Sequence, residues 1–143
     1  WDDVDAARFG LVLPLCVSLR ALRLNRVGLT SRRLRAILEP IVDDNALSRL
    51  EHLDISFNQE LGDEGARALG AALKKQGALE NLQRLYLCSC NLTATGLRAI
   101  LEPIVDDNAL SKLEELKIWG NQGLDDEGVA TLKRARPNLT LKH

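Results

Sequence analysis

Residues 82–92 have the sequence LQRLYLCSCNL, and this stretch decides the fold. It fits the pattern L-x-x-L-x-L-x-x-C-x-L, in which one position separates Leu85 from Leu87. Alternation with a period of two is typical of a β-strand, so both leucines are predicted to point into a core, and Arg84 and Tyr86 away from it. Weaker copies of the pattern recur through the chain, and self-similarity at a fixed period indicates a repeat architecture.

Each copy is opened by a leucine, and the spacing is nearly constant. The opening residues are Leu19, Leu50, Leu82, Leu113 and Leu139, separated by 31, 32, 31 and 26 residues. We therefore predict two parts. The first is an N-terminal helical segment at 1–17, which covers the first repeat. The second is a repeat domain at 18–143. Its four repeats are 19–49, 50–81, 82–112 and 113–138, and a truncated fifth strand follows at 139–143.

The repeats alternate between two forms. Residues 34–48 and 97–111 are the same fifteen-residue sequence, LRAILEPIVDDNALS, which gives a superperiod of 63 residues. Such identity indicates a recent duplication or deliberate construction. A structural or designed repeat array without a dedicated ligand is therefore one interpretation of the chain.

A helix is predicted after each strand. Short polar side chains at a helix N-terminus accept hydrogen bonds from free backbone N–H groups. The predicted N-caps are Thr30, Asp63, Thr93 and Asp126. Pro40 and Pro103 fall inside helical patterns and are expected to kink or end them. One strand and one helix cannot bury both apolar faces alone, so the units should stack into a parallel sheet with helices on its other side.

The turn after each strand contains a distinctive position. Asn58 and Asn121 occupy it in the second and fourth repeats and can bond neighbouring backbone groups, whereas Val27 and Cys90 only fill space or make weak contacts. Because helices are wider than strands, the stack should curve with the sheet on the inside.

These L-x-x-L-x-L-x-x-[N/C]-x-L segments are followed by L-x-D-E-G-A-like and L-T-x-x-G-L-like helix starts. Together they resemble the ribonuclease-inhibitor-like subclass of leucine-rich repeats, over residues 18–143. The resemblance implies an α/β leucine-rich-repeat solenoid: a curved right-handed βα superhelix with a parallel sheet on the concave side and helices on the convex side. The family includes nuclease inhibitors, sensor regions of nucleotide-binding immune receptors and the Ran GTPase-activating protein. It implies a cytoplasmic protein that binds another protein on its concave sheet.

Outward strand positions should form that concave surface. They make three rows across four strands: Ala21, His52, Arg84 and Glu115; Arg23, Asp54, Tyr86 and Lys117; Asn25, Ser56, Cys88 and Trp119. Aromatic and arginine side chains are typical interface anchors. The predicted partner-binding residues are Arg23, Asp54, Phe57, Arg84, Tyr86, Lys117 and Trp119. The alternative is a solvated face that carries mixed side chains.

Composition and spacing weigh against other classes. The chain has 19 basic and 20 acidic residues and a formal net charge of -1, which gives no basic stripe for nucleic acid. No apolar run reaches the roughly 18 residues of a membrane span. Three cysteines do not make a disulfide framework and favour a reducing compartment. Cys90 is expected to be packed and Cys88 exposed, and no His or Cys spacing fits zinc.

We therefore expect a scaffold for protein–protein interaction rather than an enzyme, with no catalytic residues, cofactor or metal. Its partner is another protein, not nucleic acid or a membrane. The chain contains no methionine, and we expect a monomer or a fragment of a larger chain. A GTPase activator similar to the Ran regulator and an immune-receptor sensor region remain alternatives.

Overall fold

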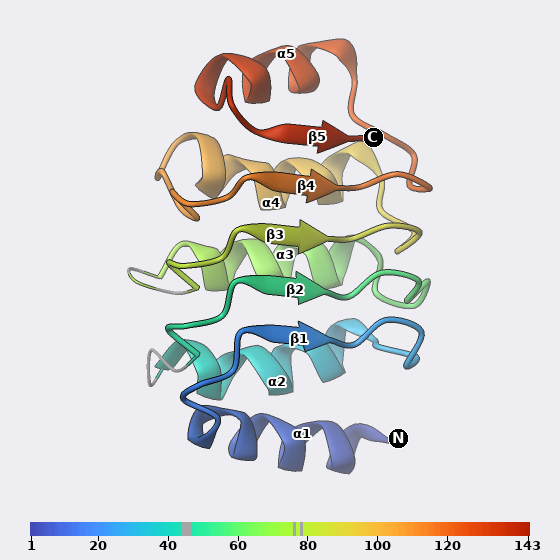
Figure 1. The fold of residues 1–143 in the computed structure, drawn as a ribbon. Helices are drawn as coiled ribbons and strands as arrows, with labels where there is room; N and C mark the ends of the chain where they lie inside the picture. The colour runs from blue at the N-terminus through green and yellow to red at the C-terminus, as the bar shows by residue number, and fades with distance from the viewer. Residues whose placement is uncertain (44–46, 76, 78) are drawn as a thin grey trace.

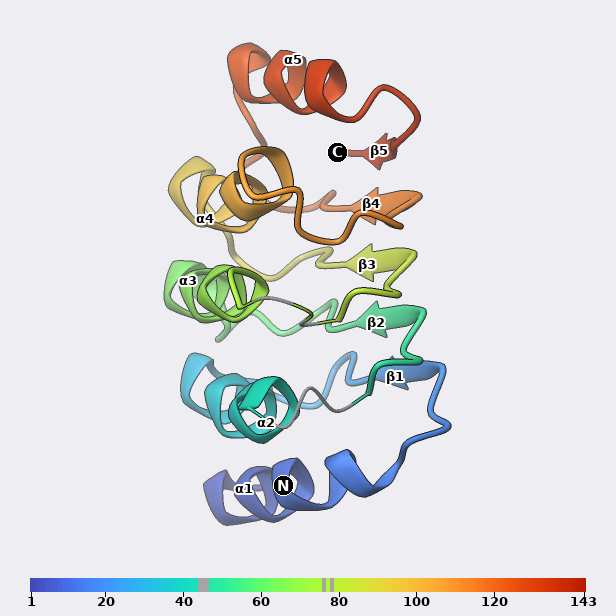
Figure 2. The same ribbon diagram turned by 90° about the vertical axis from the view of Figure 1, so that its left-hand side faces the viewer.

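The computed structural model describes residues 1–43, 47–75, 77 and 79–143. Each unit contributes one strand and one helix, and the units stack so that the strands form one layer and the helices another (Figures 1 and 2). The helices are α1 (Asp3–Val12), α2 (Ser31–Asp43), α3 (Gly62–Leu73), α4 (Ala94–Val105) and α5 (Asp126–Ala135), with a short 3-10 helix η1 (Leu13–Leu15). The strands are β1 (Ala21–Arg23), β2 (His52–Asp54), β3 (Arg84–Tyr86), β4 (Glu115–Lys117) and β5 (Thr140–Lys142).

The sheet is parallel throughout, with the strands in chain order from β1 to β5. Its register confirms the predicted alignment of the repeats. Corresponding leucines of neighbouring strands are partners, as Leu53 and Leu85 are in β2 and β3. The first two predicted rows therefore run straight across the sheet.

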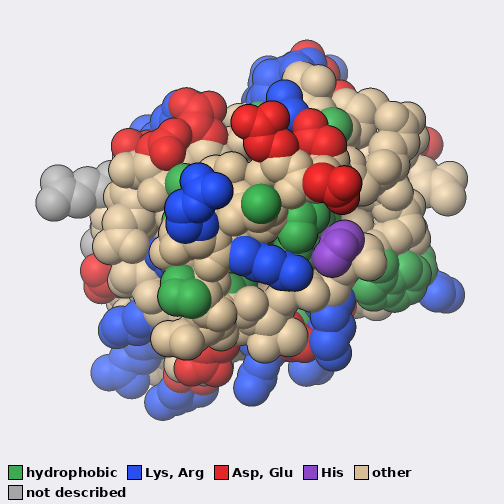
Figure 3. All heavy atoms as spheres, turned by 90° about the horizontal axis from the view of Figure 1, so that it is seen from above, with side chains coloured by type: hydrophobic (Ala, Val, Ile, Leu, Met, Phe, Trp, Pro, Cys, Tyr) green, Lys and Arg blue, Asp and Glu red, His purple; other side chains and the backbone are tan. Residues whose placement is uncertain are grey.

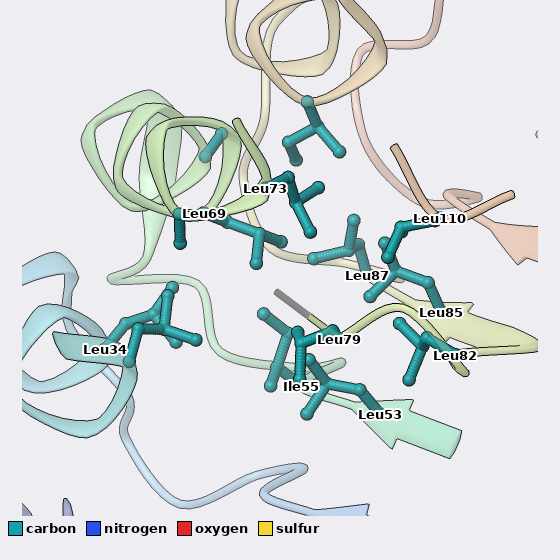
Figure 4. Close-up of a cluster of buried hydrophobic side chains, with 14 of the residues drawn as sticks. Leu34, Leu53, Ile55, Leu69, Leu73, Leu79, Leu82, Leu85, Leu87 and Leu110 are labelled. Atoms are coloured by element: carbon teal, nitrogen blue, oxygen red, sulfur yellow. The ribbon is translucent and has the colours of Figure 1, made fainter. Parts of the chain in front are cut away.

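Leucine and isoleucine side chains fill the space between the two layers (Figure 4). Leu85 and Leu87 extend from β3 and its end toward the helices, and both are fully buried. Leu69 and Leu73 reach them from α3. Each fully buried leucine contributes on the order of 1.5–3 kcal/mol. The prediction that the strand leucines are inward is confirmed.

Close helix packing depends on two glycines. A Cβ atom at Gly10 of α1 would lie 2.3 Å from the carbonyl oxygen of Ala36 in α2. A Cβ atom at Gly70 of α3 would lie 2.1 Å from the carbonyl oxygen of Ala99 in α4. These glycines therefore let the backbones of consecutive helices approach more closely than any side chain would allow.

Asn58 links two repeats through their backbones. Its Oδ1 accepts hydrogen bonds from the N–H groups of Val27 (3.1 Å) and Leu29 (2.9 Å) in the preceding turn. Its Nδ2 donates to the carbonyl oxygens of Leu24 and Ile55, both at 2.8 Å. The side chain is 1% exposed. The prediction that this asparagine bonds neighbouring backbone groups is confirmed, and the bonds cross to the previous repeat.

Asn121 repeats the arrangement one superperiod later. Its Oδ1 accepts from the N–H groups of Cys90 (2.9 Å) and Leu92 (3.1 Å), and its Nδ2 donates to the carbonyl oxygens of Leu87 and Ile118. This side chain is only partly buried. The two asparagines thus tie the first repeat to the second and the third to the fourth.

Two predicted helix caps are wrong. Helix α3 begins at Gly62, so Asp63 lies inside its first turn. The Asp63 carboxylate instead accepts hydrogen bonds from the N–H (2.8 Å) and the hydroxyl (2.6 Å) of Thr93 in the next repeat. At α5 the N-cap is Asp125, which accepts from the Gly128 N–H at 2.9 Å. Asp126 is the first helical residue there.

The proline prediction is wrong in part. Helix α2 continues past Pro40 to Asp43, and α4 continues past Pro103 to Val105. Neither helix ends at its proline. At the N-terminal end, α1 finishes at Val12, and the chain continues as the 3-10 helix that contains Pro14.

Replacing Asn58 by alanine should lower the free energy of unfolding by about 2–4 kcal/mol, because buried backbone groups lose their partners. Urea unfolding followed by circular dichroism measures the change. Asn121→Ala should cost less, since water reaches that site. Gln59→Ala, at the exposed next position, is the matched control and should shift stability by less than about 0.5 kcal/mol. Equal effects at positions 58 and 59 would contradict the linking role.

Gly70→Ala should destabilise the protein by about 1–3 kcal/mol, because the new Cβ overlaps the α4 backbone. In an open helix the same change would stabilise by about 0.5–1 kcal/mol, so the sign is diagnostic. Ala71→Gly, exposed in the same helix, measures the intrinsic helix preference. A more stable Gly70→Ala variant in thermal unfolding would show that the helices can separate without loss.

Candidate binding face

One side of the sheet carries the predicted partner-binding residues. We term it the sheet face and define it by the outward positions of the five strands: Ala21, Arg23, His52, Asp54, Arg84, Tyr86, Glu115, Lys117, Thr140 and Lys142. It lies opposite the helix layer (Figure 2). Phe57 and Trp119 follow β2 and β4. The structure therefore brings all seven predicted residues to one side. Contacts place Tyr86 and Lys117 in one group and Phe57 and Trp119 in a second, and the other three belong to neither group.

The first group surrounds Tyr86. The Tyr86 hydroxyl donates a hydrogen bond to the Glu115 carboxylate on the next strand. The Lys117 Nζ lies 4.0 Å from the centre of the tyrosine ring, and the His52 ring packs edge-on at 4.6 Å between centroids. The Lys142 Nζ lies 3.2 Å from Glu115 Oε1. Side chains from four strands therefore hold one another in place.

These contacts fix the charge of the group at neutral pH. The hydrogen bond from Tyr86, with further stabilisation by Lys142 and Lys117, lowers the pKa of Glu115. Interaction with the Tyr86 side chain, together with Glu115, raises the pKa of Lys117. Both groups are therefore held in their charged forms.

His52 is held in its neutral form. Burial lowers its pKa first, and the nearby cations Arg23 and Arg84 lower it further, against an opposing effect of Asp54. Its Nε2 atom is buried and finds no hydrogen-bond partner among the residues that the structure describes. His52 thus contributes to the sheet face mainly through the edge-on contact of its ring with the ring of Tyr86.

The second group is an aromatic ledge, defined as Arg26, Phe57 and Trp119. The Phe57 and Trp119 rings meet edge-on with centroids 5.5 Å apart, and the Arg26 guanidinium carbon lies 4.5 Å from the centre of the Phe57 ring. Trp119 is 44% exposed. A hollow lined by Gln59, Ser89, Asn91 and Gly120 begins at the residue that follows Trp119 in the chain.

Backbone geometry sets where the ledge points. Arg26, Phe57, Ser89 and Gly120 occupy equivalent positions and have φ angles of 60°, 61°, 52° and 74°. Non-glycine residues adopt this left-handed conformation uncommonly. Its recurrence in each repeat turns the chain out of the sheet at the same level and lines these positions up along the rim.

The expectation of an exposed Cys88 is wrong, because this side chain is 3% exposed. The Trp119 ring reaches Phe57 on the far side of β3, over the end of the strand where Cys88 lies. Burial raises the pKa of the Cys88 thiol. The expected packing of Cys90 is confirmed, and burial raises its pKa to about 11.

Four residues of the two groups were not singled out from the sequence, and one of them, Lys142, lies on the short strand β5. Glu115 and His52 lie in the first predicted row. The selection favoured arginine and the aromatic residues typical of interfaces, so it passed over both. Arg26 lies at the strand end, where a lone arginine gives no signal. Glu115 could have been found by its place diagonal to Tyr86 on the neighbouring strand, because such cross-strand pairs lie within reach of long side chains.

Other kinds of site find little support among the described residues. No group of three or more His, Cys, Asp or Glu side chains is gathered there in a way that could hold a metal ion. None of the helices in the described ranges is long and apolar enough to cross a bilayer. Seen from the C-terminal end, acidic, basic and apolar side chains are interspersed (Figure 3).

Comparison with known proteins agrees with this architecture. Leucine-rich-repeat family models match residues 47–70, 81–102 and 109–133. The chain is 31% identical over 134 residues to NACHT, LRR and PYD domains-containing protein 5 of Bos taurus, and 30% identical over 135 residues to the ribonuclease inhibitor of Mus musculus. The chain is a leucine-rich-repeat protein with ribonuclease-inhibitor-like relatives.

The matched regions are parts of longer relatives. They cover 94% and 93% of this chain but only 11% of the bovine protein and 27% of the murine inhibitor. Among solved structures, the leiomodin-1 actin-binding site 2 matches with a TM-score of 0.72 at 18% identity, over 96% of this chain and 76% of that one. The tropomodulin C-terminal domain of Caenorhabditis elegans matches with a TM-score of 0.72 at 16% identity, over 99% and 82%. At these identities the structural likeness concerns the fold alone.

Acid should weaken the Tyr86–Glu115 contact. A group whose pKa is lowered in the folded state stabilises above its ordinary pKa, near 4.3 for Glu, and that contribution is lost as pH falls through the folded value. As the pH is lowered below about 4.3, we expect the free energy of unfolding to fall less for Glu115→Gln than for the parent. Urea unfolding at several pH values measures this. Glu114→Gln, exposed on the adjacent position, is the control and should follow the parent. Identical curves for parent and Glu115→Gln would refute the assignment.

Proposed function

We propose that this chain is a protein-binding module whose partner docks on the sheet face and is anchored by Trp119. The observation that carries the proposal is a large exposed aromatic ring held at a fixed place by Phe57. Interface hot spots are enriched in tryptophan, tyrosine and arginine. The ledge and the Tyr86 group supply all three types on one side of the sheet.

Rigidity favours this use of the face. The rings of the ledge restrain each other, and Tyr86 is fixed by contacts to Glu115, Lys117 and His52. Side chains already ordered in the free protein lose less conformational entropy on binding. The backbone beneath them is tied by the sheet and by the asparagine links. A partner would therefore meet a preformed surface.

The relatives suggest the first partner to test. One of them is named a ribonuclease inhibitor, so its name describes a protein target. We include a ribonuclease among the partners to be tested, although the chain covers only 27% of that relative. Stimulation of GTP hydrolysis by a small GTPase would instead favour the regulatory alternative.

Trp119→Ala should weaken partner binding at least about tenfold while leaving the fold intact, because the ring is a hot-spot type and is already partly exposed. The measurement is capture from lysate, then calorimetric titration with the purified partner. Trp1→Ala is the matched control, since Trp1 is 48% exposed and belongs to neither group on the sheet side.

Tyr86→Ala should also weaken binding, and circular dichroism should show both variants folded. Capture that is equal for the parent, Trp119→Ala and Tyr86→Ala would contradict docking on this face. Loss of capture in the Trp1→Ala control would place the interface at the N-terminal end instead.

A further inference from the structure

Charge is unevenly distributed over the molecule. The ten outward strand positions of the sheet face carry four basic side chains, Arg23, Arg84, Lys117 and Lys142, and two acidic ones, Asp54 and Glu115. The whole chain has a formal net charge of -1. The sheet face is therefore net basic on a protein that is slightly acidic.

The two acidic side chains of this face are already engaged. Glu115 accepts the Tyr86 hydroxyl and lies within 4 Å of both Lys117 and Lys142. Asp54 accepts the Ser56 N–H at 2.9 Å. Each of these carboxylates therefore already accepts a hydrogen bond from a group of this chain.

Two of the basic side chains have no such partner. The side chains of Arg23 and Arg84 are exposed, and neither side chain forms a hydrogen bond or an ion pair with a described residue. An arginine binds carboxylates with two parallel hydrogen bonds, which gives direction as well as attraction. Arg84 lies on β3, where it pairs with His52 of β2 and Glu115 of β4. The sheet therefore fixes the backbone from which its guanidinium extends.

We propose that the partner of the sheet face presents an acidic segment with one aromatic or large aliphatic side chain. Its carboxylates pair with Arg23 and Arg84, and its apolar side chain packs against Trp119 beside the hollow at Ser89. This inference rests on the proposed function and names the chemistry of its partner.

Strand spacing sets the dimensions of that segment. Arg23 lies on β1 and Arg84 on β3, two strands apart. Neighbouring strands are about 4.8 Å apart, and Arg23 lies one row (two residues) further along the strand direction than Arg84, so the two arginines start roughly 12 Å apart. An extended chain rises about 3.3 Å per residue and points alternate side chains to the same side, so carboxylates about four residues apart would match. Trp119 follows β4, so the apolar side chain comes after the carboxylates as the segment crosses the sheet.

Carboxylates fit this face better than a nucleic-acid backbone. Phosphates in a nucleic acid follow one another closely and require a continuous basic track. Here Asp54 and Glu115 interrupt the cations, and a phosphate chain that crosses the sheet would pass close to both. A protein segment can place its charges at Arg23 and Arg84 alone.

Short synthetic peptides without tryptophan test the proposal by calorimetric titration. The first peptide carries two glutamates about four residues apart and one phenylalanine beyond them. Matched peptides replace both glutamates by glutamine, both by lysine, or the phenylalanine by serine, and oligouridylate of equal charge is the nucleic-acid probe. In a Trp1→Phe protein, Trp119 is the only tryptophan, and its fluorescence reports whether the peptide reaches the ledge.

The acidic peptide with phenylalanine should bind at least about tenfold more tightly than the other peptides, and added salt should weaken it. Arg23→Gln with Arg84→Gln should remove most of this difference, and lysine at both positions should keep part of it. Arg134→Gln, exposed on α5, is the matched control and should bind like the parent. Circular dichroism confirms that the variants fold.

The proposal is overturned if the acidic peptides bind no better than the glutamine or lysine peptides, if both arginines can be replaced without effect, or if oligouridylate binds more tightly. Failure of the proposed function looks different. A native partner that depends on Trp119 but lacks an acidic segment removes only the present inference. A partner whose binding is indifferent to Trp119 removes both.

Discussion

Each repeat buries its leucines only because the next repeat lies against it, and the rest of the structure depends on this stacking. A strand of three residues such as β3 cannot bury Leu85 and Leu87 by itself. In the stack, the same two residues are fully covered by α3, by neighbouring strands and by connecting segments. The parallel sheet is therefore a consequence of burial, and its exact register is the condition for placing side chains in straight rows on the opposite face.

Polar groups that cross between repeats specify how the units stack. Leucine burial alone tolerates small slips between units, because apolar contact has little direction. Asn58 does not, since its amide must meet backbone groups of both repeats at hydrogen-bond distance. Gly70 and the Asp63–Thr93 contact act in the same way on the helix side. These few residues fix the position of each repeat relative to the next. The stacked repeats therefore form one defined surface, which a preformed binding face requires.

The sheet face combines two kinds of order. Around Tyr86, charged side chains satisfy one another, so this part of the face is rigid and its acids are occupied. At the ledge, Trp119 remains open. On strands β1 and β3, Arg23 and Arg84 remain without ion-pair partners among the described residues. A surface of this kind has fixed anchors and a net positive field. Such a field favours the approach of acidic partners and weakens as ionic strength rises.

The sequence by itself determined the inward leucines, the register of the rows and the backbone bonding of Asn58, because these follow from period and from local chemistry. Only the tertiary structure decided that Cys88 is covered and that Asp63 bonds the next repeat instead of capping its own helix. It also decided that Glu115 and His52 belong to the Tyr86 group. The physical reason is distance along the chain: these contacts join side chains about one repeat or more apart, whose meeting depends on rotamers and on how large neighbours such as Trp119 extend.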